Sequence, residues 1–153
     1  PVLYCCTNPF APSLEDTDSA SGFPVGDLST VDKMFQNFTY AYSFRDTTIY
    51  GQLLAPDFSF SYRDYDIGAD ITWGRSEEMR ITNSLFRNTQ SIDLIWNEIL
   101  SSNSDSTRIV RSFNLTVTIN PLDIFYIDGK ADLYLRKTDN KWQIYRWNDE
   151  SNF

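Results

Sequence analysis

The two cysteines of this chain, Cys5 and Cys6, are adjacent, and no other cysteine occurs in its 153 residues. No disulfide can therefore cross-link the long segment that follows, which must be held together by a hydrophobic core. Apolar residues make up 41% of the chain and aromatic residues 16%, which is enough for one such core. The cysteines can form only a strained vicinal bridge, a bond to another chain or a bond to a lipid, unless they stay reduced. We expect their chemistry at an intermolecular contact and not in an active site.

The first 26 residues differ in composition from the rest of the chain. They contain four of the six prolines and three acidic residues, but no Lys or Arg. We therefore expect an extended N-terminal arm at 1–26 and a single domain at 27–153. Leu3 stands three residues before Cys6, as in the signal of a lipid-modified protein, and the same stretch also fits a remnant of a signal peptide. Both interpretations predict an extracytoplasmic protein, secreted or on the cell surface, that meets a membrane only through a lipid on Cys6.

The net charge is −8 at pH 7, and the chain contains no histidine. An acidic body without a basic stripe argues against nucleic acid as a partner. The lack of histidine excludes Ser–His and Cys–His nucleophile pairs and removes the commonest metal ligand. We expect no cofactor, no bound metal and no catalytic residue.

The periodicity of apolar residues predicts helices first and strands afterwards. Helical spacing indicates helices at about 30–45, 47–55 and 76–86. Alternation indicates strands at 58–62, 92–97, 109–119, 124–136 and 142–147. This order predicts an α+β fold in which three N-terminal helices pack on a curved antiparallel sheet, preceded by the extended arm.

Four stretches in this order resemble the nuclear transport factor 2-like (NTF2-like) superfamily, whose cone-shaped fold is shared with ketosteroid isomerase and scytalone dehydratase. They are 40–46, 53–60, 73–78 and 142–149. The resemblance covers about 27–149 and implies a cone-like domain. The words Trp73-Gly-Arg-Ser-Glu-Glu78 and Thr7-Asn-Pro-Phe-Ala-Pro12 resemble a bacterial lipoprotein-like branch. Function does not follow, because this fold serves enzymes, binding proteins and assembly modules.

In the ketosteroid isomerase relatives, a carboxylate beyond the first strand acts as base and tyrosines polarise the substrate. The resemblance implies Asp64 or Asp66 as base, and Tyr40, Tyr62 or Tyr126 as polarising groups. These acids stand in a polar stretch typical of a hydrated loop, so we expect that the chain is not an enzyme. The candidate residues for a pocket in the cone are Tyr40, Tyr62, Asp64, Trp73, Tyr126 and Trp147.

Other polar residues have simpler interpretations. Glu77 and Glu78 begin the third helix, where carboxylates complement the helix dipole. Asn37 and Asn114 begin Asn-x-Thr sequons and are candidates for glycosylation.

We expect a non-catalytic structural protein that associates with itself through its arm into a filament or surface assembly, as a homo-oligomer. A head-to-tail contact does not close on itself and therefore propagates into a fibre. The candidate residues of the assembly arm are Cys5, Cys6, Phe10, Leu14, Phe23 and Val25. The alternative is a surface-tethered protein that binds a small molecule or sugar in the cone or, as a weaker alternative, a ketosteroid isomerase-like enzyme. A cavity lined by Asp and Tyr favours binding, whereas a cone filled by Phe and Trp favours assembly.

Deletion of residues 1–26 should leave the domain folded and abolish self-association, because the arm contains neither a periodic segment nor a cysteine that the domain can use. Thermal unfolding by near-ultraviolet circular dichroism should stay cooperative and insensitive to reductant, and sedimentation should report a monomer. Phe10→Asp in the full chain is the matched variant and should weaken association alone. A molten deletion variant would refute the domain boundary, and a full chain that is already monomeric would refute assembly.

Overall fold

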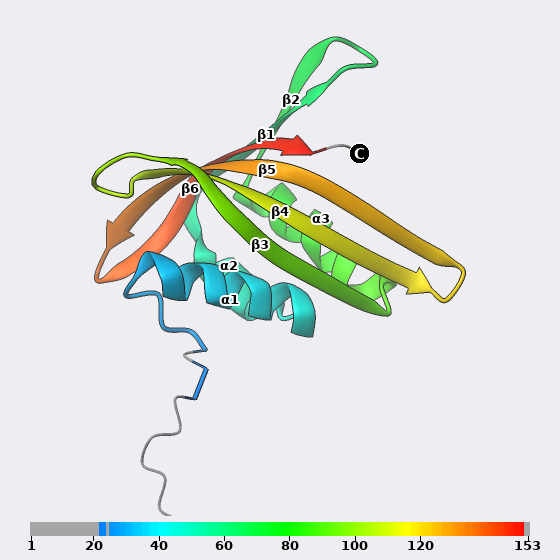
Figure 1. Ribbon diagram of the computed structural model, residues 1–153, viewed down its shortest axis with the longest axis horizontal. Helices are drawn as coiled ribbons and strands as arrows, with labels where there is room; N and C mark the ends of the chain where they lie inside the picture. Colours follow the sequence, from blue (N-terminus) through cyan, green and yellow to red (C-terminus); the bar gives the residue numbers. More distant parts are fainter. Residues whose placement is uncertain (1–21, 24, 152–153) are drawn as a thin grey trace, which may run out of the picture.

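The computed structural model describes residues 22–23 and 25–151, and most of the proposed arm, including Cys5, Cys6, Phe10 and Leu14, lies outside them. The described chain forms three helices and six strands (Figure 1). In order they are α1 (Val31–Phe44), α2 (Thr47–Leu53), β1 (Leu54–Asp64), β2 (Ala69–Gly74), α3 (Arg75–Asn88), β3 (Ser91–Ser102), β4 (Arg108–Asn120), β5 (Asp123–Thr138) and β6 (Lys141–Ser151). The predicted α+β fold with three helices is confirmed. None of the helices in the described ranges is long and apolar enough to cross a membrane.

The six strands form one curved sheet in the order β2-β1-β6-β5-β4-β3. All neighbouring pairs are antiparallel except β1 and β6, which run parallel. The prediction of an antiparallel sheet was wrong at this pair. Strands β3 to β6 follow one another as hairpins, which alternate in direction, but β1 is separated from them by α3. The alternation of direction along successive hairpins therefore does not fix the direction of β1.

The helices lie on one face of this sheet (Figure 1). Helix α1 packs against β3, and α3 packs against β1 and β2. Apolar side chains of the helices meet alternate residues of the strands in a single core. Its fully buried members include Phe38, Tyr50, Leu53, Leu133 and Ile144. The hairpin of β1 and β2 projects beyond this body (Figure 1).

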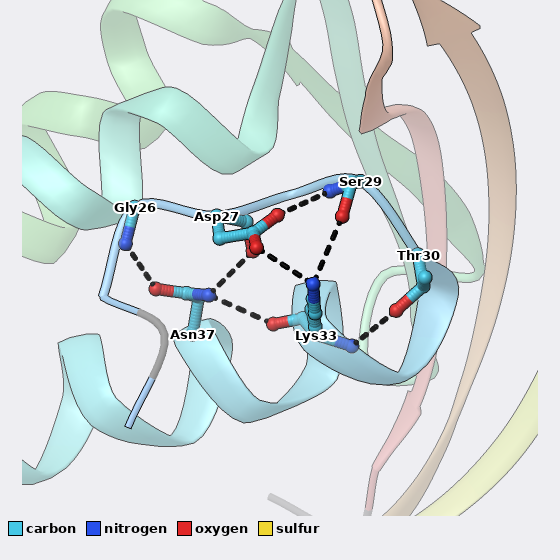
Figure 2. A network of polar contacts seen from close by, with 6 residues as sticks. All are labelled: Gly26, Asp27, Ser29, Thr30, Lys33 and Asn37. Carbon is cyan, nitrogen blue, oxygen red and sulfur yellow. Dashed lines mark hydrogen bonds and ion pairs between the residues drawn. The ribbon is translucent and has the colours of Figure 1, made fainter. Parts of the chain in front are cut away.

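The start of α1 is fastened by a buried asparagine (Figure 2). Asn37 is fully buried, and its Oδ1 accepts a hydrogen bond from the Gly26 amide at 2.7 Å. Its Nδ2 donates to the carbonyl oxygens of Asp27 at 3.0 Å and Lys33 at 2.9 Å. Thr30 caps the helix by accepting from the Lys33 amide. The sequon at Asn37 is therefore sealed inside the folded domain.

The second Asn-x-Thr sequon, which begins at Asn114, is exposed to solvent. Asn114 is exposed on β4, where its Nδ2 donates to Asp128 and its Oδ1 accepts from Asn97 at 2.5 Å. Glycosylation at Asn114 stays a prediction.

The last residues of the arm contact their own domain. The ring of Phe23 stacks on Tyr40 of α1, with the ring centroids 5.2 Å apart. Phe23 and Val25 nevertheless remain 43% and 47% exposed. Phe23, proposed as an anchor for a neighbouring subunit, thus has a partner on its own α1.

Asn37→Ala should lower the free energy of unfolding by about 2–3 kcal/mol, because it removes three hydrogen bonds and leaves partly buried backbone groups unpaired. Denaturant titration measures this change. Asn88→Ala is the matched control, since the exposed Asn88 amide bonds only within its own helix, and it should stay within about 0.5 kcal/mol of the wild type. Equal losses in both variants would contradict the proposed fastening of α1.

Candidate functional site

The cone contains a cavity of about 270 Å³ between the sheet and helices α1 and α3. Its wall is mainly aromatic and aliphatic, but four of its side chains carry oxygen. The lining consists of Phe38, Tyr42, Phe60, Trp73, Glu78, Ile81, Thr82, Leu85, Leu94, Trp96, Phe113, Leu115, Ile127, Trp147 and Asp149. Two of these residues are carboxylic acids, and both are more than nine-tenths buried. A cone with this interior is hollow, with acidic groups in an apolar wall.

Glu78 is held rigidly by three donors from three elements. Its Oε1 accepts from the hydroxyls of Tyr50 on α2 at 2.6 Å and of Thr82 on α3 at 3.1 Å. Its Oε2 accepts from the indole N–H of Trp73 on β2 at 2.6 Å. Both oxygens are therefore engaged, as a buried carboxyl group requires. Glu78 stands in the first turn of α3, as the sequence predicted, but its side chain is only 5% exposed, which was not predicted from the sequence.

Asp149 has one engaged oxygen and one open oxygen. The amide and hydroxyl of Ser151 both donate to Oδ2. Among the described residues, Oδ1 accepts no hydrogen bond, and the nearby indole N–H of Trp147 is also without a hydrogen-bond partner. Asp149 therefore offers a buried carboxyl group with a reachable oxygen.

Burial raises the pKa of the Asp149 carboxyl, and the nearby charge of Glu78 raises it further. The Ser151 hydrogen bonds oppose this shift, as does a weaker interaction with the indole of Trp147. Asp149 thus keeps its proton to a higher pH than an ordinary aspartic acid. A carboxyl group of this kind is suited to give or take a proton.

Gly129 permits the arrangement around Asp149. It pairs with Ser151 across β5 and β6, and a Cβ at this position would lie 2.7 Å from Cα and Cβ of Ser151. Any larger residue would push Ser151 away. Gly129 thus marks a close approach of β6 to the continuous strand β5.

Tyr42 also lines the cavity, whereas Tyr50 is fully buried outside its lining and donates a hydrogen bond to Glu78. Burial raises the pKa of Tyr42, and the charges of Glu78 and Asp149 raise it further. Burial likewise raises the pKa of Tyr50, whose hydroxyl donates to Glu78. Both phenols stay protonated and act as hydrogen-bond donors.

The predicted pocket residues are only partly brought together. Trp73 and Trp147 line the cavity. Tyr62 lies beside Trp73, with the ring centroids 5.7 Å apart, but it lines an outer groove instead. Tyr40 packs between Phe23 and Phe44 outside the cavity.

The remaining candidates lie far from the cone's interior. Asp64 ends β1, where its Oδ1 accepts from the amides of Asp66 and Ile67 in the turn to β2. Asp66 is exposed in this turn. Tyr126 is 74% exposed on β5. These residues do not share the environment that the resemblance to ketosteroid isomerase implies.

Sequence reasoning missed the two acids that line the cavity, although a pattern marks each of them. Glu78, Thr82 and Phe86 recur every four residues on α3 and are its buried residues. Asp149 follows Trp147 by two residues and therefore shares its face of β6. Within the described ranges, no group of three or more His, Cys, Asp or Glu side chains is placed to hold a metal ion.

The free energy of unfolding of the Asp149→Asn variant, compared with that of the wild type at the same pH, should increase as the pH rises from about 3 to about 7. A raised pKa means that the folded state binds the proton more tightly than the unfolded state, so the wild type loses stability between pH 3.8 and the raised value. The amide cannot titrate and escapes this loss. Urea titration at several pH values measures the difference. Asp139→Asn, in the exposed β5–β6 turn, should show no such trend, and a pH-independent difference for Asp149→Asn would contradict the assignment.

Comparison with proteins of known structure identifies the fold. No family model and no curated protein matches the sequence. The Kfla4162 protein from Kribbella flavida has a similar structure, with a TM-score of 0.68, 11% identity and coverage of 83% of this chain and 91% of that one. A scytalone dehydratase-like protein from Novosphingobium aromaticivorans has a TM-score of 0.68 and 13% identity, over 80% and 82% of the two chains. A dehydratase-like member of the NTF2-like family from Streptomyces avermitilis has a TM-score of 0.62 and 16% identity, over 83% and 96%.

These neighbours contradict the prediction that the chain is not an enzyme, because similar structures carry the names of dehydratases. That prediction judged only the loop acids Asp64 and Asp66 and overlooked the buried pair, Glu78 and Asp149. At sequence identities this low, the structural similarity establishes the fold alone. The activity has to be inferred from the site. The chain has the fold of the NTF2-like proteins, a cone of three helices on a curved mixed sheet.

Proposed function

We propose that the cone binds a small, largely apolar organic molecule and that Asp149 exchanges a proton with it. The observation that carries this proposal is the cavity of about 270 Å³, whose apolar wall contains a buried carboxyl group with an open oxygen. Binding sites for small molecules typically combine an apolar wall with a few placed polar groups. Of the two functions expected from the sequence, a cavity with acidic and phenolic groups favours ligand binding.

The two acids have different roles in this proposal. Glu78 has both oxygens engaged by fixed donors, so it acts as a stationary charge and hydrogen-bond acceptor. Asp149 has a free oxygen and a raised pKa, so it is the group that transfers the proton. Glu78 is a positioning residue, because its charge acts on the ligand through Asp149.

The reaction class follows from this single proton-transferring group. A carboxylate can remove a proton from an activated C–H, and a carboxylic acid can give a proton to a departing hydroxyl. Isomerisation and dehydration of a small ring compound are built from these steps. The dehydratase names of the structural neighbours are consistent with this class.

The proposal can be tested without the natural substrate. In 5-nitrobenzisoxazole, loss of the ring proton to a base breaks the N–O bond and forms a coloured nitrophenolate. A carboxylate in an apolar cavity should accelerate this elimination, and the rate should rise as the pH passes the raised pKa of Asp149. Asp149→Asn should lower kcat/KM about a hundredfold. Asp139→Asn, on the surface, should have no effect.

The role of Glu78 has its own readout in the same assay. Glu78→Gln removes the charge that raises the pKa of Asp149, so the rise in rate should move to lower pH. Near-ultraviolet circular dichroism verifies that the variant is folded. A wild type no faster than free acetate, or a folded Asp149→Asn with full activity, would refute the proposed function.

Assembly through the arm is a separate proposal. Its support is the composition of residues 1–26 and the isolated pair Cys5 and Cys6. The lipid on Cys6, the extracytoplasmic location and the lipoprotein-like branch belong to the same proposal. Deletion of the arm, as described above, tests it without involving the cone.

A further inference from the structure

A second hollow adjoins the cone at the ends of β1 and β6. The parallel pairing of these strands ends at Tyr62 and Asp149. Beyond this point β1 pairs only with β2, and β6 only with β5, so the two ends separate. Figure 1 shows the hairpin of β1 and β2 turning away from the end of β6. The groove between them measures about 490 Å³ and is lined by Ser61, Tyr62, Arg63, Tyr65, Asp70, Asn148, Asp149, Glu150 and Ser151.

Asp149 lines both this groove and the cavity in the cone. Asp149 is only 7% exposed, and its open oxygen Oδ1 lacks a hydrogen-bond partner among the described residues. The cavity wall is mainly apolar, whereas the groove is lined mainly by polar and charged residues. A molecule that passes Asp149 would therefore meet apolar surroundings on one side and polar surroundings on the other.

The charge of the groove is negative. It contains one guanidinium, of Arg63, against the carboxyl groups of Asp70, Asp149 and Glu150. Arg63 is paired with Asp70 at 3.1 Å, which leaves the acids on β6 without a cation in the groove. Lys130 is the cross-strand neighbour of Glu150, but no ion pair joins them within the described chain.

We infer that this groove is a second subsite, which holds the polar end of an amphipathic ligand and prefers an ammonium group to a carboxylate. The inference rests on the proposed function, since the apolar part of the same ligand would occupy the cone. The ligand class is thus a compact ring system with a short amine-bearing arm. Glu150 is the residue that determines specificity, because its charge lines the groove but not the cavity.

Three probes with one ring system separate the contribution of the groove from that of the cone. These are 2-(aminomethyl)naphthalene, 2-(hydroxymethyl)naphthalene and 2-naphthoic acid, whose binding to the full chain is measured by calorimetry at neutral pH and low salt. The amine should bind about tenfold or more tightly than the acid, with the alcohol between them. The difference should shrink in high salt, because the groove is open to solvent.

Two substitutions of Glu150 sharpen the test. Glu150→Gln should reduce the ratio of the affinity for the amine to the affinity for the acid, and Glu150→Lys should make the acid the tighter ligand. Binding of the neutral alcohol should stay unchanged in both variants. Glu98→Lys is the matched control, since it makes the same charge change at an exposed position on β3, at the opposite edge of the sheet. It should leave the preference intact.

The outcomes distinguish the two proposals. Equal binding of all three probes, unaffected by Glu150→Lys, would overturn the subsite and leave the proposed function standing. Leu94→Trp should fill the cavity and abolish binding of the alcohol. An amine preference that survives this change would show that the groove acts without the cone, which overturns the amphipathic ligand. No binding of any probe would overturn both proposals.

Discussion

The hydrogen bonds to the Glu78 carboxyl group are the interaction on which the hollow cone depends. A buried carboxyl group is costly unless its oxygens are satisfied, and here the donors come from α2, β2 and α3. Movement of β2 away from α3 would leave Oε2 unpaired, and movement of α2 would remove one of the two donors to Oε1. Glu78 therefore ties the helices to the hairpin of β1 and β2, and the cavity wall on that side is rigid. A rigid wall is what a small-molecule site needs to orient its ligand.

Burial is the main cause of the raised pKa values in the cavity, and the charge of Glu78 adds to its effect. This charge lies close enough to Asp149 to raise the pKa of that acid, and it acts in the same direction on Tyr42. Both oxygens of Glu78 accept hydrogen bonds from fixed donors, whereas Asp149 keeps one oxygen open. The two acids thus differ in role because their hydrogen-bond partners differ. One fixed charge next to one titrating group is a recurring arrangement for proton transfer at neutral pH.

The parallel pair of β1 and β6 places this chemistry between two environments. Because β1 pairs with β6 only as far as Tyr62 and Asp149, Asp149 stands where the sheet opens. The cone lies on one side of it and the acidic groove on the other. The polar and apolar parts of the proposed ligand would therefore be sorted at Asp149, the residue that we propose transfers the proton. The role of the arm in assembly is a separate proposal.

Local patterns were sufficient for the helices and for the hairpins from β3 to β6, but they did not predict β2 or its hairpin with β1. The spacing of Met34, Phe38 and Tyr42 defines α1, and alternation from Ile109 to Val117 defines β4, because these periods follow from backbone geometry alone. Tertiary structure alone decided the direction of β1 and the partners that surround Glu78 and Asp149. A glutamate in the first turn of a helix suits the dipole equally well on the surface, and only the approach of Tyr50 and Trp73 makes it a buried group. Likewise, Asp149 is enclosed because β6 is flanked by β1 and β5, a long-range pairing that no local period encodes.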